Sequence, residues 1–248
     1  MSPSTDHREN REFASELKFL VSTALAYEIE DWARDRLLPD PNAGGPSGDT
    51  YLITSLYFDT AQSDVYHRRG SFGRSKYRIR RYDESERVFL ERKLRTRGLL
   101  AKRRCIVALE ELPRLAEADT ERGWTGFWFH RRLLARQLGP VCRIAYDRTA
   151  RVTMTANGPI RLTLDHNLRG LPASGLWFSE QEGSPLLPGQ VIVELKFRRE
   201  TPQLFKHLVA EFALNARTFS KYRLAAAHLG LVNKPALAAQ PEGLPAYA

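Results

Sequence analysis

The chain contains few of the residues that build disulfide frameworks and zinc sites. Its 248 residues include two cysteines, Cys105 and Cys142, and neither lies in a CxxC pair or a Cys/His cluster. This scarcity argues against a disulfide framework and against a structural zinc site, and we interpret both cysteines as small core residues. The histidines between residues 67 and 228 also lack metal-ligand spacing, so we expect them on the surface or in the core.

Long apolar runs are absent as well. No segment approaches the roughly 20 apolar residues that cross a bilayer. Residues 1–11 are polar and charged, unlike a signal peptide. We therefore expect no transmembrane segment, a cytoplasmic location, and a separate chain for any membrane partner.

Basic residues outnumber acidic ones. Lysine and arginine number 38 against 29 aspartates and glutamates, which gives a formal charge of +9 and a pI near 9.8. This balance suits phosphate-bearing partners or an anionic membrane surface, and net charge alone does not separate the two. Hydrophobic residues make up 42% of the chain, enough for a core. We expect one folded domain over residues 11–232, a disordered N-terminus at 1–10, and a flexible Pro/Ala tail at 233–248.

The order of strand and helix patterns predicts an α+β fold. Ser22 is the predicted N-cap of a helix that ends before Pro39. Further helical segments are expected at 112–138, with a break near Gly123, and at 201–214 and 219–229. The later part of the first segment is expected to bury Phe127, Leu134 and Leu138. Alternating patterns predict strands at 13–19, 51–58, 75–82, 87–95, 102–110, 141–155, 160–166 and 190–198. So many strands with few edges favour a closed or nearly closed, largely antiparallel β-barrel with peripheral helices.

Basic residues recur at every second position in several of these strands. The pattern is present in 76–80, 91–95, 102–104 and 194–196, and it sends the charges to one face of each strand. If that face lines a barrel, two glutamates cannot balance six or seven cations, and a bound oligoanion is expected. Arginine favours phosphate in particular, because its planar guanidinium binds in a bidentate manner. The alternative is an ordinary solvated outer face, and the pattern does not decide which face points inward.

Eight short strings, in order along residues 11–232, resemble the VTC domain. This domain is the polyphosphate polymerase module of the vacuolar transporter chaperone complex, within the triphosphate tunnel superfamily. The matching strings are ELK at 16–18, SLYFD at 55–59, KYRIRRY at 76–82, VFLERK at 88–93, YDRTA at 146–150, RLTLD at 161–165, VELK at 193–196 and FSKY at 219–222.

The resemblance implies a basic tunnel that holds ATP or another nucleoside triphosphate together with a growing inorganic polyphosphate chain. It also implies a divalent metal, Mn²⁺ or Mg²⁺, held mainly by Glu194. Lys18, Arg78, Arg80 and Lys93 are the residues implied for the catalytic step. Further phosphate contacts are implied for Lys102, Arg148, Arg161, Ser220 and Lys221. Tyr57 and Asp59 match a string at the tunnel wall.

The sequence departs from the family pattern at two positions. Thr218 replaces a basic residue before the FSKY string, and Arg217 is a neighbour that could substitute for it. Ala14 replaces the first acid of the Glu-x-Glu-x-Lys pattern that many tunnel triphosphatases carry, which argues against their two-metal site. A hydrolase would need a carboxylate to orient water, and Glu16 and Glu91 are the available residues.

Several other functions stay open at this point. A catalytically silent polyphosphate receptor fits the same cations, and a nucleic-acid-binding barrel would use Tyr77, Tyr82 and Phe89 as stacking platforms. We expect no specific nucleic acid partner. The segment 124–136 combines four aromatics with a basic stripe, which is either a solvated face, a partner contact or a cap on a tunnel mouth.

Overall fold

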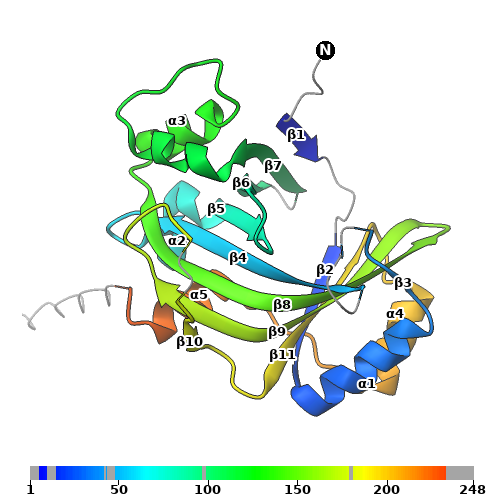
Figure 1. The fold of residues 1–248 in the computed structure, drawn as a ribbon. Coiled ribbons are helices and arrows are strands. Elements are labelled where there is room, and N and C mark those ends of the chain that lie inside the picture. Colours follow the sequence, from blue (N-terminus) through cyan, green and yellow to red (C-terminus); the bar gives the residue numbers. More distant parts are fainter. Residues whose placement is uncertain are drawn as a thin grey trace, which may run out of the picture.

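The protein is one strongly curled antiparallel sheet with helices on its outside (Figure 1). The computed structural model describes residues 6–9, 15–41, 43, 48–96, 99–178 and 181–232. Along the sheet the strands follow the order β1-β7-β6-β5-β4-β8-β9-β11-β2, with β10 paired to β9 and β3 paired to β8. Every pairing in this part of the chain is antiparallel.

The observed elements lie close to the predicted ones. The strands are β1 (Asp6–Glu9), β2 (Ser15–Ser22), β3 (Leu38–Pro39), β4 (Thr50–Asp59), β5 (Ser75–Tyr82), β6 (Arg87–Thr96), β7 (Leu99–Ala108), β8 (Gly139–Thr155), β9 (Gly158–Pro172), β10 (Ser184–Pro185) and β11 (Gln190–Phe197). The helices are α1 (Thr23–Arg34), α2 (Asp64–His67), η1 (Gly70–Arg74), η2 (Leu109–Ala116), α3 (Phe127–Ala135), α4 (Gln203–Glu211) and α5 (Lys221–His228), where η marks a 3₁₀ helix. The predicted cap at Ser22 is confirmed, because its hydroxyl accepts a hydrogen bond of 3.2 Å from the Leu25 amide.

The sheet curls into a nearly closed barrel, but the two edges that the structure describes do not pair. In the described residues the sheet path ends at β1 on one side and at β2 on the other, with no pairing between them. The curl nevertheless brings residues of β2 and of β6, from near the two ends of the sheet path, into the lining of one cavity. Asp6–Glu9, within the segment for which we predicted disorder, pairs with the otherwise open edge of β7. The predicted tail at 233–248 lies outside the described residues.

The outer face of β2, β9 and β11 packs against α1 and α4. Phe19 of β2, Leu162 of β9 and Val193 of β11 are almost fully buried there. They meet Ile29 of α1 and Phe205 of α4, which are fully buried. Because apolar side chains take the outward positions of these strands, the charged positions between them point into the barrel. This burial decides the direction that the sequence pattern left open.

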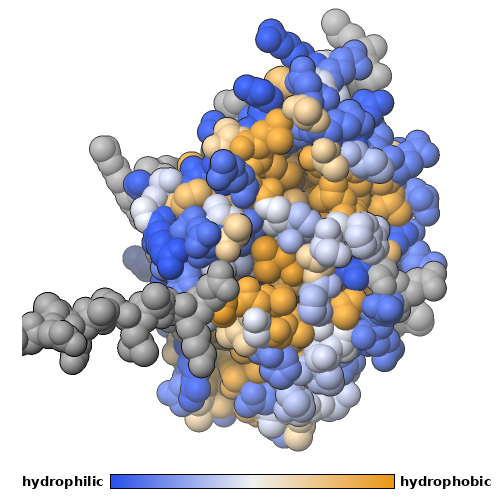
Figure 2. Space-filling model, turned by 90° about the vertical axis from the view of Figure 1, so that its left-hand side faces the viewer, coloured by the Kyte–Doolittle hydropathy of each residue, from blue (hydrophilic) through white to orange (hydrophobic). Residues whose placement is uncertain are grey.

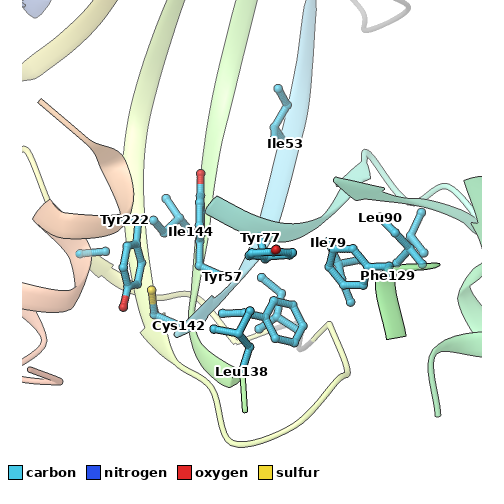
Figure 3. Packing of buried hydrophobic residues seen from close by; sticks show 14 of the residues in the cluster. Ile53, Tyr57, Tyr77, Ile79, Leu90, Phe129, Leu138, Cys142, Ile144 and Tyr222 are labelled. Carbon is cyan, nitrogen blue, oxygen red and sulfur yellow. The ribbon is translucent and has the colours of Figure 1, made fainter. Parts of the chain in front are cut away.

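The outer face of β4–β7 is covered by η2 and α3. The Phe129 ring of α3 meets Phe58 edge-on, with ring centroids 5.8 Å apart, and lies 6.0 Å from Tyr77. Ile79 and Leu90 lie at one side of this apolar cluster, and Cys142 and Tyr222 lie together at the other (Figure 3). Both cysteines are buried and neither forms a disulfide, as predicted.

The prediction of which α3 residues face the core is partly wrong. We expected this helix to bury Phe127, Leu134 and Leu138. Leu138 is buried as predicted, although it lies beyond the helix, whereas Leu134 is 41% exposed and Phe127 is half-buried. The residues that face the sheet are Phe129, His130 and Leu133, because the helix starts only at Phe127 and ends at Ala135, before Leu138. His130 therefore does not belong to an exposed basic stripe, and its imidazole Nε2 lies 2.9 Å from the Glu117 carbonyl.

The aromatic segment packs onto the sheet. Trp124 is buried. The indole N–H of Trp128 donates to the Cys105 thiol at 3.1 Å, and the Arg103 guanidinium lies 4.4 Å from the Trp128 ring. These contacts account for the aromatics without a cap on a tunnel mouth.

None of the described helices has the length and apolarity needed to span a bilayer. The face at the left of Figure 1, which carries α2, α5 and β10, shows apolar residues bordered by hydrophilic ones in Figure 2. Trp177, in the segment between β9 and β10, is 58% exposed.

Candidate functional site

A cavity of about 100 Å³ lies inside the curled sheet, and its lining is mostly cationic. Among the described residues, eight cationic side chains and three carboxylates line it, a formal excess of five positive charges. The cations are Lys18, Lys76, Arg78, Arg80, Lys93, Arg148, Lys196 and Lys221, and the acids are Glu16, Glu91 and Glu194. Three tyrosines and Ser220 complete the lining. Such an excess of positive charge in a confined space favours a bound polyanion.

Glu194 of β11 is the main acceptor at the β2 side of the cavity. Its carboxylate lies 3.0 Å from the Lys196 ammonium, 3.2 Å from Lys221, 3.3 Å from Lys18 and 3.8 Å from Arg148. Burial opposes its ionisation, but these cations outweigh burial and hold the pKa of Glu194 well below the ordinary value. Glu194 is therefore ionised at neutral pH and shared among four cations.

Asp165 of β9 holds two of the same cations beside Glu194. It accepts a bidentate pair of hydrogen bonds from the Arg148 guanidinium, at 2.6 and 2.8 Å, and lies 2.5 Å from the Lys221 ammonium. Asp165 is fully buried, and its own burial opposes ionisation. Arg148 and Lys221 nevertheless hold the pKa of Asp165 below its ordinary value. The pair Asp165–Arg148 fixes the guanidinium at the cavity wall.

Glu91 of β6 plays a corresponding role for another group of cations. Its carboxylate accepts from the Arg78 Nε at 2.6 Å and lies 3.1 Å from the Lys102 ammonium. Burial opposes ionisation here too, but Arg78, Arg80 and Lys102 hold the pKa of Glu91 well below its ordinary value. A carboxylate engaged by two cations is poorly placed to orient a water molecule.

Arg80, Lys93 and Lys76 differ from these cations because no carboxylate pairs with them among the described residues. Arg80 donates to the Ser55 and Tyr146 hydroxyls, at 3.3 and 3.2 Å, and its guanidinium lies 5.9 Å from the centre of the Tyr82 ring. Lys76 donates to the Ser220 hydroxyl at 2.9 Å. Burial and nearby cations lower the pKa of Lys93 to about 7 and that of Lys76 to about 8. Of the cations that line the cavity, these three are therefore the best placed to pair with a bound anion.

The N-terminus of α5 closes one part of the cavity wall. Ser220 is its N-cap and accepts from the Arg223 amide at 3.4 Å. The Tyr222 hydroxyl donates to Asp59 at 2.5 Å, and the Tyr222 ring stacks on Tyr57 with centroids 5.6 Å apart. Asp59 also accepts from the Val65 and Tyr66 amides. Of the two residues expected at the tunnel wall, Tyr57 lines the cavity, whereas Asp59 anchors α2 and α5.

The structure brings most of the predicted site residues together. Eight of the ten line the cavity, namely Lys18, Arg78, Arg80, Lys93, Arg148, Glu194, Ser220 and Lys221. Lys102 lies behind them on Glu91. Arg161 lies farther along β9, where it contacts Asp40 at 2.6 Å and the Tyr51 hydroxyl at 2.8 Å.

Of the two departures from the family pattern, the structure describes one. Thr218 and Arg217 are both exposed, and the Arg217 amide donates to the Lys18 carbonyl at 2.7 Å. Ala14 lies outside the described residues.

Three charged residues of the site were not among the predicted set. Lys76 and Lys196 follow the same two-residue alternation as Arg78 and Glu194, so the strand pattern could have found them. Asp165 has no such signal, because a single acid in an apolar strand is equally consistent with a surface position.

The donor set limits how a divalent metal could bind. The described residues contain no group of three or more His, Cys, Asp or Glu placed to hold a metal ion. Mg²⁺ commonly takes one or two carboxylates and completes its shell with substrate phosphates and water. Glu194, with Asp165 beside it, fits that mode of binding and does not fit a metal held by the protein alone.

Comparisons with known proteins identify the family of this chain and one solved structure of similar fold. The family model described as VTC domain matches residues 13–229. A candidate adenylate cyclase from Bacillus halodurans is similar in structure, with a TM-score of 0.51 and 16% identity over 86% of this chain and 95% of that chain. A candidate adenylyl cyclase from Hippeastrum, described as having a dominant triphosphatase activity, gives a TM-score of 0.46 and 17% identity over 89% and 97% of the two chains. A search of curated proteins by sequence finds no match. At this identity the Bacillus halodurans structure shows the fold alone.

Proposed function

Because the chain belongs to the VTC domain family, we propose that it is a metal-dependent phosphotransferase that extends inorganic polyphosphate with the γ-phosphoryl group of ATP. The observation that carries this proposal is the charge balance of the cavity, in which eight cations face three carboxylates among the described residues. A linear chain of phosphates supplies the missing negative charge and fits a narrow passage between strands.

The reaction needs no strong base. A terminal phosphate oxygen of the acceptor chain forms a bond to the γ-phosphorus of ATP, and the bond between the γ-phosphorus and the bridging oxygen breaks. ADP leaves with that electron pair, so no proton has to move. The acceptor phosphate is already largely ionised near pH 7. Positioning and neutralisation of the peripheral oxygens therefore supply most of the rate acceleration.

The residues divide into two groups by their partners. Arg148 and Arg78 are held in place by Asp165 and Glu91, and they present fixed guanidinium groups to the phosphates. Arg80 and Lys93 lack a carboxylate partner in the described part of the chain, and they would exchange weak contacts for phosphate oxygens. Ser220 and the α5 amides offer neutral donors at the helix N-terminus.

A divalent metal would be held by Glu194 together with substrate phosphates. When bound, it would neutralise charge on the triphosphate oxygens. Lys18, Lys196 and Lys221 contact Glu194 in the absence of ligand, and they would turn to the phosphates as the metal takes its place on that carboxylate.

Incubation of the purified protein with ATP and Mn²⁺ tests the proposal. The expected products are polyphosphate and ADP, resolved by gel electrophoresis and ion-exchange chromatography. ADP with free phosphate and no polymer would instead indicate a hydrolase. Binding of polyphosphate without any ADP would indicate a receptor.

Affinity for tripolyphosphate should fall as the pH rises from 6 to 9. Lys93 and Lys76, with pKa values of about 7 and about 8, are charged at the acidic end and lose their charge over this window. Bound phosphate favours the charged forms, and each lost charge should weaken binding by about tenfold. Isothermal titration calorimetry across the window measures the effect.

Lys93→Met provides the control for this pH dependence. Ionisation of the ligand itself affects both proteins equally, so the difference between the two curves isolates Lys93. The variant should bind more weakly at pH 6 and show a flatter curve. Parallel curves for the two proteins would show that Lys93 does not titrate in this range.

A further inference from the structure

An arginine-rich surface lies on the outside of the sheet, around α2, η1, α3 and α5. We define the arginine surface as Arg68, Arg69, Arg74, Arg132, Arg136 and Arg223. Over the described residues 60–75, 127–136 and 221–228, Asp64 is the only acid. It pairs with Arg69 at 3.1 Å. The other five arginines have no carboxylate partner among the described residues, so the surface carries a strong uncompensated charge.

Contacts between the elements make this surface continuous. Arg136, just after α3, donates to the Ser71 hydroxyl at 3.0 Å, and its guanidinium lies 4.0 Å from the centre of the Phe72 ring. Arg223 of α5 lies 5.2 Å from the centre of the Tyr66 ring of α2. Stacking on aromatic rings limits the motion of these guanidinium groups and leaves their N–H groups available. The side chains are therefore held ready for an anion at little cost in conformational entropy.

The backbone at Arg68 is held in an unusual conformation. Arg68 adopts the left-handed region, with φ 59° and ψ 37°, and Ser63 at the other end of α2 does so too. This conformation is strained in a residue other than glycine, so the surrounding structure must hold it in place. Gly73 of η1 packs so closely that an added Cβ would lie 2.7 Å from the Arg68 carbonyl oxygen. The fold thus fixes the position of Arg68 at the start of η1.

The arginine surface adjoins the cavity. Arg74 ends η1 and is followed directly by β5, whose Lys76 lines the cavity and donates to Ser220. Arg68 lies near enough to Lys76 for its charge to contribute to the lowered pKa of that lysine. The cationic lining therefore continues from Lys76 to the exterior. A cavity of about 100 Å³ holds only a few phosphates, so a longer chain has to leave it.

We propose that the arginine surface binds the part of a polyphosphate chain that extends out of the cavity beside Lys76. This inference takes its ligand, polyphosphate, from the proposed function and rests on it in that respect. All six residues are arginines, and guanidinium matches phosphate oxygens in geometry as well as in charge. The surface makes affinity depend on chain length, because only a chain longer than the cavity can reach it.

The test compares tripolyphosphate with long-chain polyphosphate, with binding measured by calorimetry at low salt. The variant Arg132→Gln/Arg136→Gln should bind long-chain polyphosphate about tenfold more weakly than the wild type, since it removes two modest charge contacts at the surface. Its affinity for tripolyphosphate should be unchanged. The control Arg34→Gln/Arg36→Gln removes the same charge from the α1 region, where Arg36 also stacks on an aromatic ring, Trp32, at 4.7 Å. This control should bind both ligands as the wild type does.

Each outcome decides between specific alternatives. Equal long-chain affinity in the variant and the control overturns the proposed surface. If the wild type does not bind tripolyphosphate, the proposed function is wrong. Weaker long-chain binding by Arg132→Gln/Arg136→Gln alone would still support the arginine surface in that case. Binding to phosphatidylglycerol vesicles that depends on Arg132 and Arg136, and that long-chain polyphosphate does not displace, would overturn the proposal in favour of a membrane contact.

Discussion

Asp165→Asn should lower the free energy of unfolding of the ligand-free protein by about 3–5 kcal/mol, since it leaves buried cations without their counter-charge. Asp165 is fully buried and receives both Arg148, at 2.6 and 2.8 Å, and Lys221, at 2.5 Å. Asparagine keeps the shape of the side chain and removes the charge. Urea denaturation of both proteins at pH 7 measures the difference, with the slope of the transition compared as well.

The stability difference between Asp165→Asn and the wild type should also depend on ligand and on pH. Tripolyphosphate should recover part of the lost stability, because its oxygens replace the missing carboxylate beside Arg148. The pKa of Asp165 is lowered in the folded protein, so its contribution is complete above the unfolded-state value of about 3.9 and is lost as the pH falls further. The gap between wild type and variant should therefore narrow in acid.

Asp31→Asn is the matched control for Asp165→Asn. Asp31 also pairs with an arginine, Arg34, but its side chain is 74% exposed. Exposed ion pairs contribute about 0–1 kcal/mol, so this variant should unfold within that margin of the wild type. A similar small effect at Asp165 would mean that Glu194 alone compensates Arg148 and Lys221.

Sequence patterns predicted the strands well because each strand alternates sharply. In β11, Val191, Val193 and Leu195 face the helices, whereas Glu194 and Lys196 face the cavity. An alternation of this kind fixes both the strand and the set of residues that share a face. The helix after β2 was equally clear, because Ser22 caps it and Pro39 follows it.

The direction of the charged face could not be predicted from the pattern, because each strand has one charged and one apolar face in either arrangement. It depends on which face the helices cover, and that is a property of the tertiary fold. The phase of α3 was missed for a related reason. Phe127, Phe129 and Leu134 are all apolar, so the helix start at Phe127 decides which of them turns inward.

The ion pairs among the cavity residues could not be predicted from the sequence either. Arg148 of β8 and Arg80 of β5 both point into the cavity. The sequence strings that contain these two arginines give no sign of which one is paired with an acid. Arg148 is neutralised by Asp165 across the β8–β9 pairing. Arg80 contacts the Ser55 and Tyr146 hydroxyls and the Tyr82 ring, and it has no ion pair with a carboxylate among the described residues. Register therefore decides which guanidinium is committed to the fold and which is available to a ligand.

Arg80→Gln should reduce phosphoryl transfer by about 10²–10³-fold, the loss expected when a fixed donor to the transition state is removed. Unlike Asp165→Asn, it should not destabilise the ligand-free protein. Arg80 is 7% exposed and forms no direct ion pair with a carboxylate among the described residues, and Glu91, the acid nearby, is already engaged by Arg78 and Lys102, so removing the Arg80 charge breaks no buried ion pair. The measurements are ADP formation from ATP with Mn²⁺, and urea denaturation with and without tripolyphosphate.

Arg81→Gln separates the role of Arg80 from a general loss of charge. Arg81 is the next residue of the same strand, and it points away from the cavity, where it donates to the Ser85 and Glu84 carbonyls at 2.8 Å. This variant should keep its activity and the stabilisation that tripolyphosphate gives. Arg80→Gln should lose both, because ligand-induced stability measures affinity for the folded state. Equal activity of the two variants would show that Arg80 does not contact the transferred phosphoryl group, and that its buried charge serves another purpose.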